Sequence, residues 1–340
     1  MRYLQNKESE KIELDLKDKK ILLILSNNCR TPFTIIAKKV GLSRDAVAYR
    51  IKNLEEKGLI QGYRTVVNIN KFSCFAFHIF IQLKQPDKEA EEKIIKRIQR
   101  YNFVRAILKF NGKYDFEIAL IAKNMEEFDR ISEVILKDFG KFIQDYEILI
   151  LTKDYISSTF PKSFFEDKEF IDRLNNGENM VKESEKIKFD IKDIGILKGI
   201  SNKASIPLYE LADNLKISAD SVAYRIKNMV KFGIIQKFVP VINHSSINYS
   251  NYAVLLRINN FENNEEKIKS FLEQDKNILW ATKTVGKYNL LLYLLVKNTE
   301  DLHLTLNSLR ALLPGEISSF ENLIAYEEYK YTYFTDYIKA

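Results

Sequence analysis

The chain has 340 residues, of which 46% are hydrophobic and 29% charged, a balance typical of a folded globular protein with more than one domain. No apolar run approaches the roughly 18 residues of a membrane span, and the polar start MRYLQNKESEK does not resemble a signal peptide, so we expect a cytoplasmic protein without a membrane partner. The net charge of +7 is compatible with a polyanionic partner but does not require one.

The sequence contains a long internal repeat. VAYRIKN occurs at 47–53 and again at 222–228, and residues 7–61 and 182–236 are identical at 27 of 55 positions. Further along, GKYD at 112–115 matches GKYN at 286–289. We therefore predict an α+β protein made of two tandem copies of one unit, each with a helix-turn-helix followed by a sheet domain.

Residues 1–66 are predicted to form the first DNA-binding domain, a winged helix-turn-helix. Apolar residues recur at helical spacing before Gly58, and Gly41 has the spacing of the turn residue between two helices. Ser43 is placed to cap the second helix, with Asp45 in its first turn. After Gly58, the segment 59–69 is expected to form the strand-turn-strand of a wing.

A helical wheel places Val47, Ile51 and Leu54 on the buried side of the second helix. The opposite side carries polar residues that recur in the second copy, which burial does not explain. We therefore predict that two recognition helices read two half-sites of double-stranded DNA, about one turn or roughly 34 Å apart. The candidate DNA-binding residues are Ser43, Arg44, Tyr49, Arg50, Lys52, Asn53, Ser218, Tyr224, Arg225, Lys227 and Asn228. The alternative is a solvated helix face in a protein-binding winged helix.

Residues 67–160 are predicted to form a ferredoxin-like domain with the order β-α-β-β-α-β. Branched and aromatic segments at 75–84, 104–110, 116–123 and 146–153 are typical of strands, and helices are expected at 88–101 and 125–139. Residues 161–185 form a polar linker that is expected to hold one short helix. The second winged helix-turn-helix occupies 186–242 and the second ferredoxin-like domain 243–340, with strands near 252–258, 279–285, 290–296 and 322–329.

The second copy departs from the first at three positions that matter for function. Lys216 stands at the turn where the first copy has Gly41, and a lysine with positive φ costs on the order of 1 kcal/mol. Ala219 replaces Arg44, and Asn289 replaces Asp115. We expect weaker DNA binding by the second copy and a different effector preference, or none.

Residues 14–63 and the sheet domain containing NGKYDFEIAL resemble the leucine-responsive regulator/AsnC (Lrp/AsnC) family of transcription factors, and nearly the whole chain resembles it twice over. The resemblance implies a DNA-binding winged helix joined to a regulatory (RAM-type) domain that pairs sheet to sheet. It also implies an amino acid or similar small effector, and either an intrachain pseudo-dimer or a homo-oligomer. The effector-binding residues carried over are Gly112, Tyr114, Asp115, Gly286, Tyr288 and Asn289. The simpler interpretation of 111–112 is a hairpin turn.

Two other classes of function stay open. Siroheme decarboxylases resemble this family and would need basic and histidine side chains around a tetrapyrrole, but His78, His244 and His303 do not recur between the copies. No acid–base pair, metal cluster or phosphate loop is evident, so no cofactor, metal site or catalytic residue is predicted. An interaction protein that has lost DNA binding is the third class. Cys29 and Cys74 are expected to be buried apolar filler.

Overall fold

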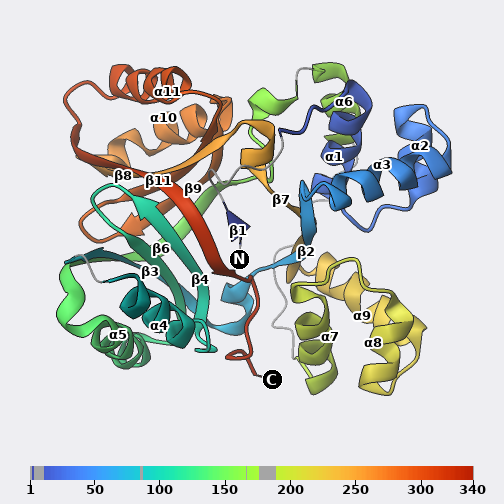
Figure 1. Ribbon diagram of the computed structural model, residues 1–340, viewed down its shortest axis with the longest axis horizontal. Helices are drawn as coiled ribbons and strands as arrows, with labels where there is room; N and C mark the ends of the chain where they lie inside the picture. The colour runs from blue at the N-terminus through green and yellow to red at the C-terminus, as the bar shows by residue number, and fades with distance from the viewer. Residues whose placement is uncertain (1, 4–10, 85–86, 166, 176–188, 340) are drawn as a thin grey trace. The chain divides into compact units, whose positions relative to one another are not determined.

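The computed structural model describes residues 2–3, 11–84, 87–165, 167–175 and 189–339 (Figure 1). The described residues form two compact units, and each unit takes segments from both copies of the repeat. The sheet unit contains 74–164 and 244–331 together with the short strand β1 (Arg2–Tyr3). The helical unit contains 12–73, the described part of 165–243, and 332–339. The last segment, expected in the second ferredoxin-like domain, therefore groups with the helices.

The helical unit holds two helix-turn-helix motifs of the same design. Each has three helices followed by one strand: α1 (Leu16–Asn27), α2 (Phe33–Val40), α3 (Arg44–Glu56) and β2 (Ile60–Val67), then α7 (Ile191–Ser201), α8 (Leu208–Leu215), α9 (Ala219–Lys231) and β7 (Ile235–Ile242). A 3-10 helix, η1 (Ile69–Phe72), follows β2. The short helix expected in the linker is α6 (Lys168–Asn175), and 176–185 lie outside the described residues.

The prediction of a hairpin wing at 59–69 is wrong. Residues Ile60–Val67 form one strand, and this strand pairs antiparallel with β7 of the other copy, with Thr65 opposite Phe238. Gly62 lies at an irregularity in this pairing with φ 144°. A strand needs a partner for its backbone groups, and here the second copy supplies it. The two helix-turn-helix motifs are thereby joined by a two-stranded sheet.

The sheet unit repeats the order β-α-β-β-α-β twice, as predicted. The first copy has β3 (Phe75–Leu83), α4 (Lys88–Ile98), β4 (Val104–Asn111), β5 (Phe116–Ala122), α5 (Met125–Phe139) and β6 (Ile143–Ser157). The second has β8 (Ser250–Ile258), α10 (Phe261–Gln274), β9 (Ile278–Val285), β10 (Leu290–Val296), α11 (Thr299–Leu312) and β11 (Ile317–Tyr331). The 3-10 turns are η2 (Gly140–Phe142), η3 (Lys162–Phe164) and η4 (His244–Ile247).

The two ferredoxin-like sheets form one closed sheet. The strand order is β11-β4-β5-β3-β6-β9-β10-β8, and β11 also pairs with β8, which closes the cycle of eight strands. The copies meet at two seams, β6 with β9 and β4 with β11, and all of these pairings are antiparallel. The short strand β1 adds to β11. Regulatory copies of one chain thus pair with each other through backbone hydrogen bonds.

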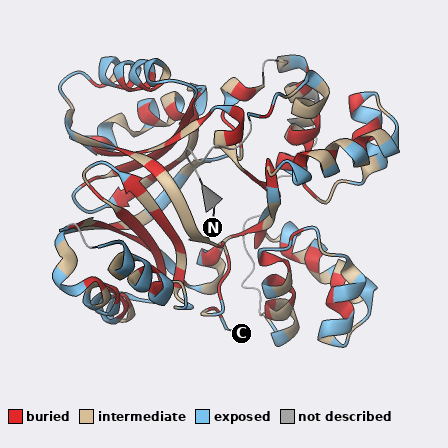
Figure 2. Cartoon of the chain, in the orientation of Figure 1, coloured by how far each residue is buried: buried red, intermediate tan, exposed pale blue. Residues whose placement is uncertain are grey.

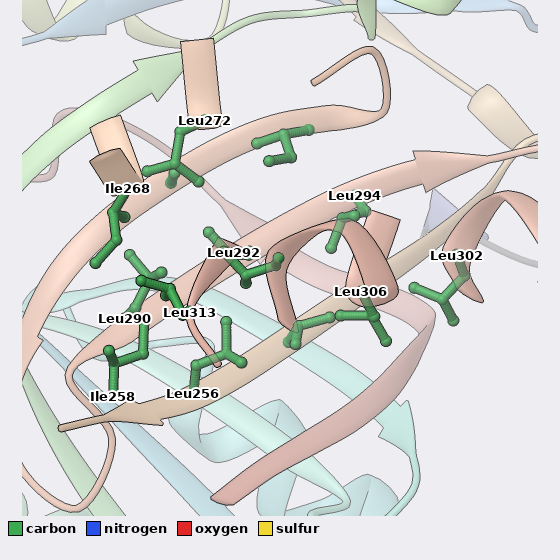
Figure 3. Packing of buried hydrophobic residues seen from close by; sticks show 14 of the residues in the cluster. Leu256, Ile258, Ile268, Leu272, Leu290, Leu292, Leu294, Leu302, Leu306 and Leu313 are labelled. Atoms are coloured by element: carbon green, nitrogen blue, oxygen red, sulfur yellow. The ribbon is translucent and has the colours of Figure 1, made fainter. Parts of the chain in front are cut away.

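Both faces of the central strands are buried, which explains why β5 and β10 are so apolar. On the outer face of the second copy, Ile268 and Leu272 of α10 and Leu306 of α11 pack onto leucines of β10 (Figure 3). The inner face holds a cluster to which both copies contribute. The central strands β5 and β10 are consequently buried along their whole length, whereas the helices expose their outer sides (Figure 2).

Candidate DNA-binding and effector sites

The second helix of each helix-turn-helix has the capped start and the buried side that the sequence predicts. The Ser43 hydroxyl accepts a hydrogen bond from the Ala46 amide at 3.1 Å, and Ser218 does the same for Ser221. In α3 the buried residues are Val47, Ile51 and Leu54, and in α9 they are Val222, Ile226 and Met229. The recognition helices are therefore fixed in rotation about their own axes.

The opposite side of each recognition helix is exposed and polar. The aromatic side chains Tyr49 and Tyr224 are 71% and 67% exposed, which is unusual for residues of this size. Lys52 and Lys227 are exposed, whereas Asn53 and Asn228 are half-buried. Lys52 has only a long ion pair to Glu56, 3.5 Å within the same helix, so its charge is accessible from solvent.

Arg50 and Arg225, two of the predicted DNA-binding residues, form ion pairs within the protein. The Nη1 atom of Arg50 lies 2.7 Å from carboxylate oxygens of both Asp15 and Asp18, in the N-cap and first turn of α1. Hydrogen bonding to Asp18 raises the pKa of this guanidinium. Arg225 repeats the arrangement with Asp190 and Asp193. Each arginine therefore ties a recognition helix to the helix that precedes the motif, because its charge is neutralised inside the protein.

A lysine supports the turn in each motif. The Lys17 ammonium donates to the carbonyl oxygen of Val40, at the end of α2, and Lys192 does the same for Leu215 at the end of α8. The next residue has left-handed backbone in both copies: Gly41 with φ 70° and Lys216 with φ 54°. The positive φ expected for Lys216 is thus confirmed. The second copy keeps the turn although a side chain is present there.

The two helix-turn-helix motifs differ in charge. Residues 33–58 carry six basic and three acidic side chains, and residues 208–233 carry four basic and three acidic ones. The exposed Lys38 and Lys39 of α2 correspond to Asp213 and Asn214 of α8. Arg44, exposed at the start of α3, corresponds to Ala219. The first copy therefore presents the more basic surface.

The predicted effector residues lie in the hairpin loops that join β4 to β5 and β9 to β10. A Cβ atom at Gly112, where φ is 146°, would lie 3.0 Å from the carbonyl oxygen of Asn322 in β11. At Gly286 it would lie 2.5 Å from the carbonyl oxygen of Ile148 in β6. Glycine is required at both because each loop packs against a strand of the other copy. The hairpin-turn interpretation of 111–112 is correct.

The other four predicted effector residues have packing or bracing contacts. Tyr114 and Tyr288 are buried in the inner cluster. The Asp115 carboxylate accepts the Leu83 amide at 2.7 Å, and burial raises its pKa. The Asn289 side chain bonds both backbone groups of Ile258. These contacts hold the loops against the ends of β3 and β8.

An open pocket of about 510 Å³ adjoins the first loop. It is lined by Gln82, Leu83, Lys84, Gly112, Lys113, Asp115 and Gln144. Lys113 forms a 3.5 Å ion pair with Glu321 of the second copy. The pocket thus combines ammonium groups with amide and carboxylate oxygens, a set that matches a small zwitterion.

The structure also brings together a buried polar cluster that sequence analysis missed. His78 of β3 contacts the carboxylate of Glu117 in β5, and Tyr293 of β10 donates a hydrogen bond to the same carboxylate. This is an acid–base pair that the sequence did not reveal, because the three residues come from separate strands. The available signal was a polar residue in the middle of an apolar strand, His78 in β3 and Glu117 in β5.

The two cysteines lie in the interior. Cys29 and Cys74 are buried and form no disulfide, as expected, and burial raises the pKa of Cys29 to about 12. Among the described residues, no group of three or more His, Cys, Asp or Glu side chains has the arrangement of a metal site. Within the same residues, no helix combines the length and apolar character needed to cross a bilayer.

The fold and the exposed, capped recognition helices define a duplicated helix-turn-helix protein with paired ferredoxin-like domains. A family described as winged helix-turn-helix DNA-binding matches residues 14–61 and 189–236. The HTH-type transcriptional regulator LrpA of Pyrococcus horikoshii is 36% identical over 128 residues, which cover 38% of this chain and 87% of that protein. The proline dehydrogenase transcriptional activator of Rhodobacter capsulatus is 29% identical over 119 residues, covering 35% and 77%. The chain belongs to the Lrp/AsnC family of transcriptional regulators.

A solved structure shares the duplicated architecture. The siroheme decarboxylase NirDL superposes with a TM-score of 0.61 and 14% sequence identity, over 94% of each chain. At this identity the likeness concerns the fold. The arrangement of two fused copies in one chain therefore occurs in another protein as well.

Proposed function

We propose that this chain is a sequence-specific transcriptional regulator that binds duplex DNA through α3 and α9 and reads two half-sites. The observation that carries the proposal is the repeated exposed face of these helices. The heptad VAYRIKN is kept in both copies, its apolar members are buried, and Tyr49 and Lys52 remain exposed together with Tyr224 and Lys227. A DNA-binding role accounts for repetition of the exposed members.

We assign roles to the proposed contact residues by their chemistry. Lys52 and Lys227 contact phosphates, and Asn53 and Asn228 pair with adenine in the major groove. Ser43 and Ser218 lie at helix N-termini, where a free amide and a hydroxyl suit a phosphate oxygen. Tyr49 and Tyr224 stack or bond to the backbone, and Arg44 adds a phosphate contact in the first copy only. Arg50 and Arg225 position the helices.

The second copy is proposed to contribute less to affinity. The side chains at 213 and 214 replace two lysines on the helix that crosses the DNA backbone in this motif. Asp213 would lie near phosphates, and Ala219 removes a cation. The protein would then bind an asymmetric operator, held mainly by the first copy.

We further propose that an amino acid or a similar zwitterion binds in the pocket beside Gly112. Lys84 and Lys113 would hold a carboxylate, and amide and carbonyl oxygens of the pocket would hold an ammonium group. Titration calorimetry with the 20 common amino acids tests this proposal, with Lys113→Ala as the variant that should lose binding. The same loop in the second copy has an uncharged amide at Asn289, so one effector per chain is expected.

The regulator is proposed to act in the cytoplasm and without catalysis. The test is fluorescence anisotropy of the purified chain on a duplex from its own upstream region and on a scrambled duplex, each across a salt series. Sequence-dependent binding that weakens steeply with salt supports the proposal. Absence of binding at low salt contradicts it, and a tetrapyrrole absorption band in the purified protein would favour the decarboxylase alternative.

A further inference from the structure

The inner face of the closed sheet contains an asymmetric contact between the two regulatory copies. In the first copy, the imidazole of His78 contacts the carboxylate of Glu117 in the protein interior. Glu117 is only 1% exposed. The second copy contributes Tyr293, which donates to Glu117. Burial and the neighbouring carboxylate raise the pKa of Tyr293, so its hydroxyl keeps its proton. Trp280 completes the cluster, with its ring centre 6.1 Å from that of His78 and 5.6 Å from that of Tyr293.

At matched positions of the repeat, polar side chains in one copy correspond to apolar side chains in the other. The fourth residue of β3 is His78 and that of β8 is Ala253; the second residue of β5 is Glu117 and that of β10 is Leu291. Large aromatic side chains in the second copy correspond to alanines in the first. Trp280 of β9 corresponds to Ala106 of β4, and Tyr293 of β10 to Ala119 of β5. One copy supplies the acceptor and the space, and the other supplies the donor and the large rings.

We propose that the inner faces of the two copies are complementary to each other. The first copy therefore pairs with a second copy in preference to the first copy of another chain. This inference does not depend on DNA binding. Two first copies would leave each Glu117 without a hydroxyl donor and would leave space where Trp280 and Tyr293 lie now. Two second copies would bury two tyrosine hydroxyls without a carboxylate and would crowd four large rings. Unmatched polar groups, cavities and overpacking each destabilise a protein core.

One seam between the copies carries a charge contact that favours unlike copies over two second copies. Glu265 of α10 accepts hydrogen bonds from Lys153 at 2.6 Å and from Tyr155 at 2.8 Å, both in β6 of the first copy. The eleventh residue of β6 is Lys153, and the eleventh of β11 is Glu327. A pair of two second copies would place Glu327 beside Glu265, and two carboxylates repel each other. This contact is independent of the inner cluster and disfavours pairing of two second copies only, since two first copies would place Lys153 beside Glu91.

The first test is a double-mutant cycle in the full-length chain, read by urea unfolding. Tyr293→Ala leaves a cavity beside Glu117, and Glu117→Leu leaves the Tyr293 hydroxyl without its acceptor. The double variant recreates the leucine–alanine combination present at Leu291 and Ala119. We expect each single variant to unfold at lower urea and the double variant to lose clearly less than the sum of the two losses. Strict additivity would overturn the proposal. Tyr293→Phe, which removes only the hydroxyl, keeps the test usable if the larger changes prevent folding.

The second test reads the pairing itself with cysteine pairs. Ile150 lies opposite Val285 at one seam, and Ile324 lies opposite Asn111 at the other. Ile150→Cys with Val285→Cys reports pairing of unlike copies, because directly opposed antiparallel residues have Cα atoms within disulfide range. Ile150→Cys with Asn111→Cys reports pairing of two first copies, which requires two chains. The single-cysteine variants control for Cys29 and Cys74, which are buried.

Both reporters are refolded from denaturant at the same protein concentration and then oxidised. We expect the first reporter to cross-link within one chain and the second to give no covalent dimer. Adding Trp280→Ala and Tyr293→Ala should raise the dimer yield of the second reporter several-fold, although the covalent tether between the copies is unchanged. An equal dimer yield in both backgrounds would show that the tether alone selects the partner, and would overturn the proposal.

Discussion

Nη1 of Arg50 lies 2.7 Å from Oδ1 of Asp18, so the recognition helix α3 is joined to the first turn of α1 by a charge-assisted hydrogen bond. The same contact joins Arg225 to Asp193 in the second copy. Because both side chains are partly buried, the contact acts on the orientation of the helix. This gives a direct way to separate residues that hold the recognition helix from residues that touch DNA.

Arg50→Ala should destabilise the first helix-turn-helix by about 1–3 kcal/mol, since two carboxylates lose their partner. Lys52→Ala, a neighbouring exposed cation, should change stability by less than about 0.5 kcal/mol. Urea unfolding of the two variants measures the difference. Equal stability of both variants would mean that the ion pair seen at Arg50 does not support the helix.

Removing Lys52 and Lys227 together should weaken binding to all duplexes and reduce the slope of log affinity against log salt by about two. Anisotropy titrations between low and moderate salt give this slope. Of the single variants, Lys52→Ala should weaken binding more, because the first copy presents the more basic surface. An unchanged affinity in the double variant would remove α3 and α9 from the DNA interface.

Asn53→Ala and Asn228→Ala should relax sequence preference and have a smaller effect on non-specific binding. A bidentate contact to adenine contributes about 1–3 kcal/mol of discrimination. Competition between the preferred duplex and single-base variants locates the affected position in each half-site. If all duplexes weaken by the same factor, these asparagines contact the backbone and do not read bases.

The left-handed turn residue offers a reciprocal stability test. Lys216→Gly should stabilise the second motif by up to about 1 kcal/mol, since relief of backbone strain exceeds the entropy cost of glycine. Gly41→Lys should cost the first motif about 1 kcal/mol. Amide hydrogen exchange in α3 and α9 reports each motif separately. Opposite signs for the two variants are expected, and the same sign would contradict the assignment of strain.

Stability should fall between pH 6.5 and pH 4 because of His244. Its ring nitrogen Nε2 lies 2.8 Å from the carbonyl oxygen of Thr159, and burial lowers its pKa to about 4. In the unfolded chain the imidazole of His244 becomes protonated near pH 6.5, whereas in the folded protein it stays neutral down to about pH 4. Protonation therefore favours the unfolded state between these two pH values. The loss amounts to at most about 3 kcal/mol. Urea unfolding from pH 8 to pH 5 should show a flatter profile for His244→Gln than for the unchanged chain.

The sequence predicts local features of this protein well and pairings between distant segments poorly. The caps at Ser43 and Ser218, the buried side of α3 and the left-handed Lys216 all depend on residues within a few positions of each other. The partner of β2 does not, because a strand carries no local record of which other strand will satisfy its backbone. The wing was therefore predicted within 59–69, whereas β2 pairs with β7.

The candidate sites follow the same rule. The exposed Tyr49 follows from a helical wheel, but the inward contact of Arg50 depends on Asp15 and Asp18, more than 30 residues away. The carried-over Tyr114 is buried by packing from both copies. The pattern marks Glu117 as a polar residue in an apolar strand, but its contact with Tyr293, 176 residues away, depends on how the strands pair.

The pairing of β6 with β9 and of β4 with β11 within one polypeptide has a consequence for gene dosage. A regulator assembled from separate subunits loses its dimers on dilution, so its response to its own abundance is steeper than linear. Here the two regulatory copies stay together at any concentration, because their association is intramolecular. Pairing of the two copies should therefore be independent of protein abundance, and it should be as complete at a few molecules per cell as at many.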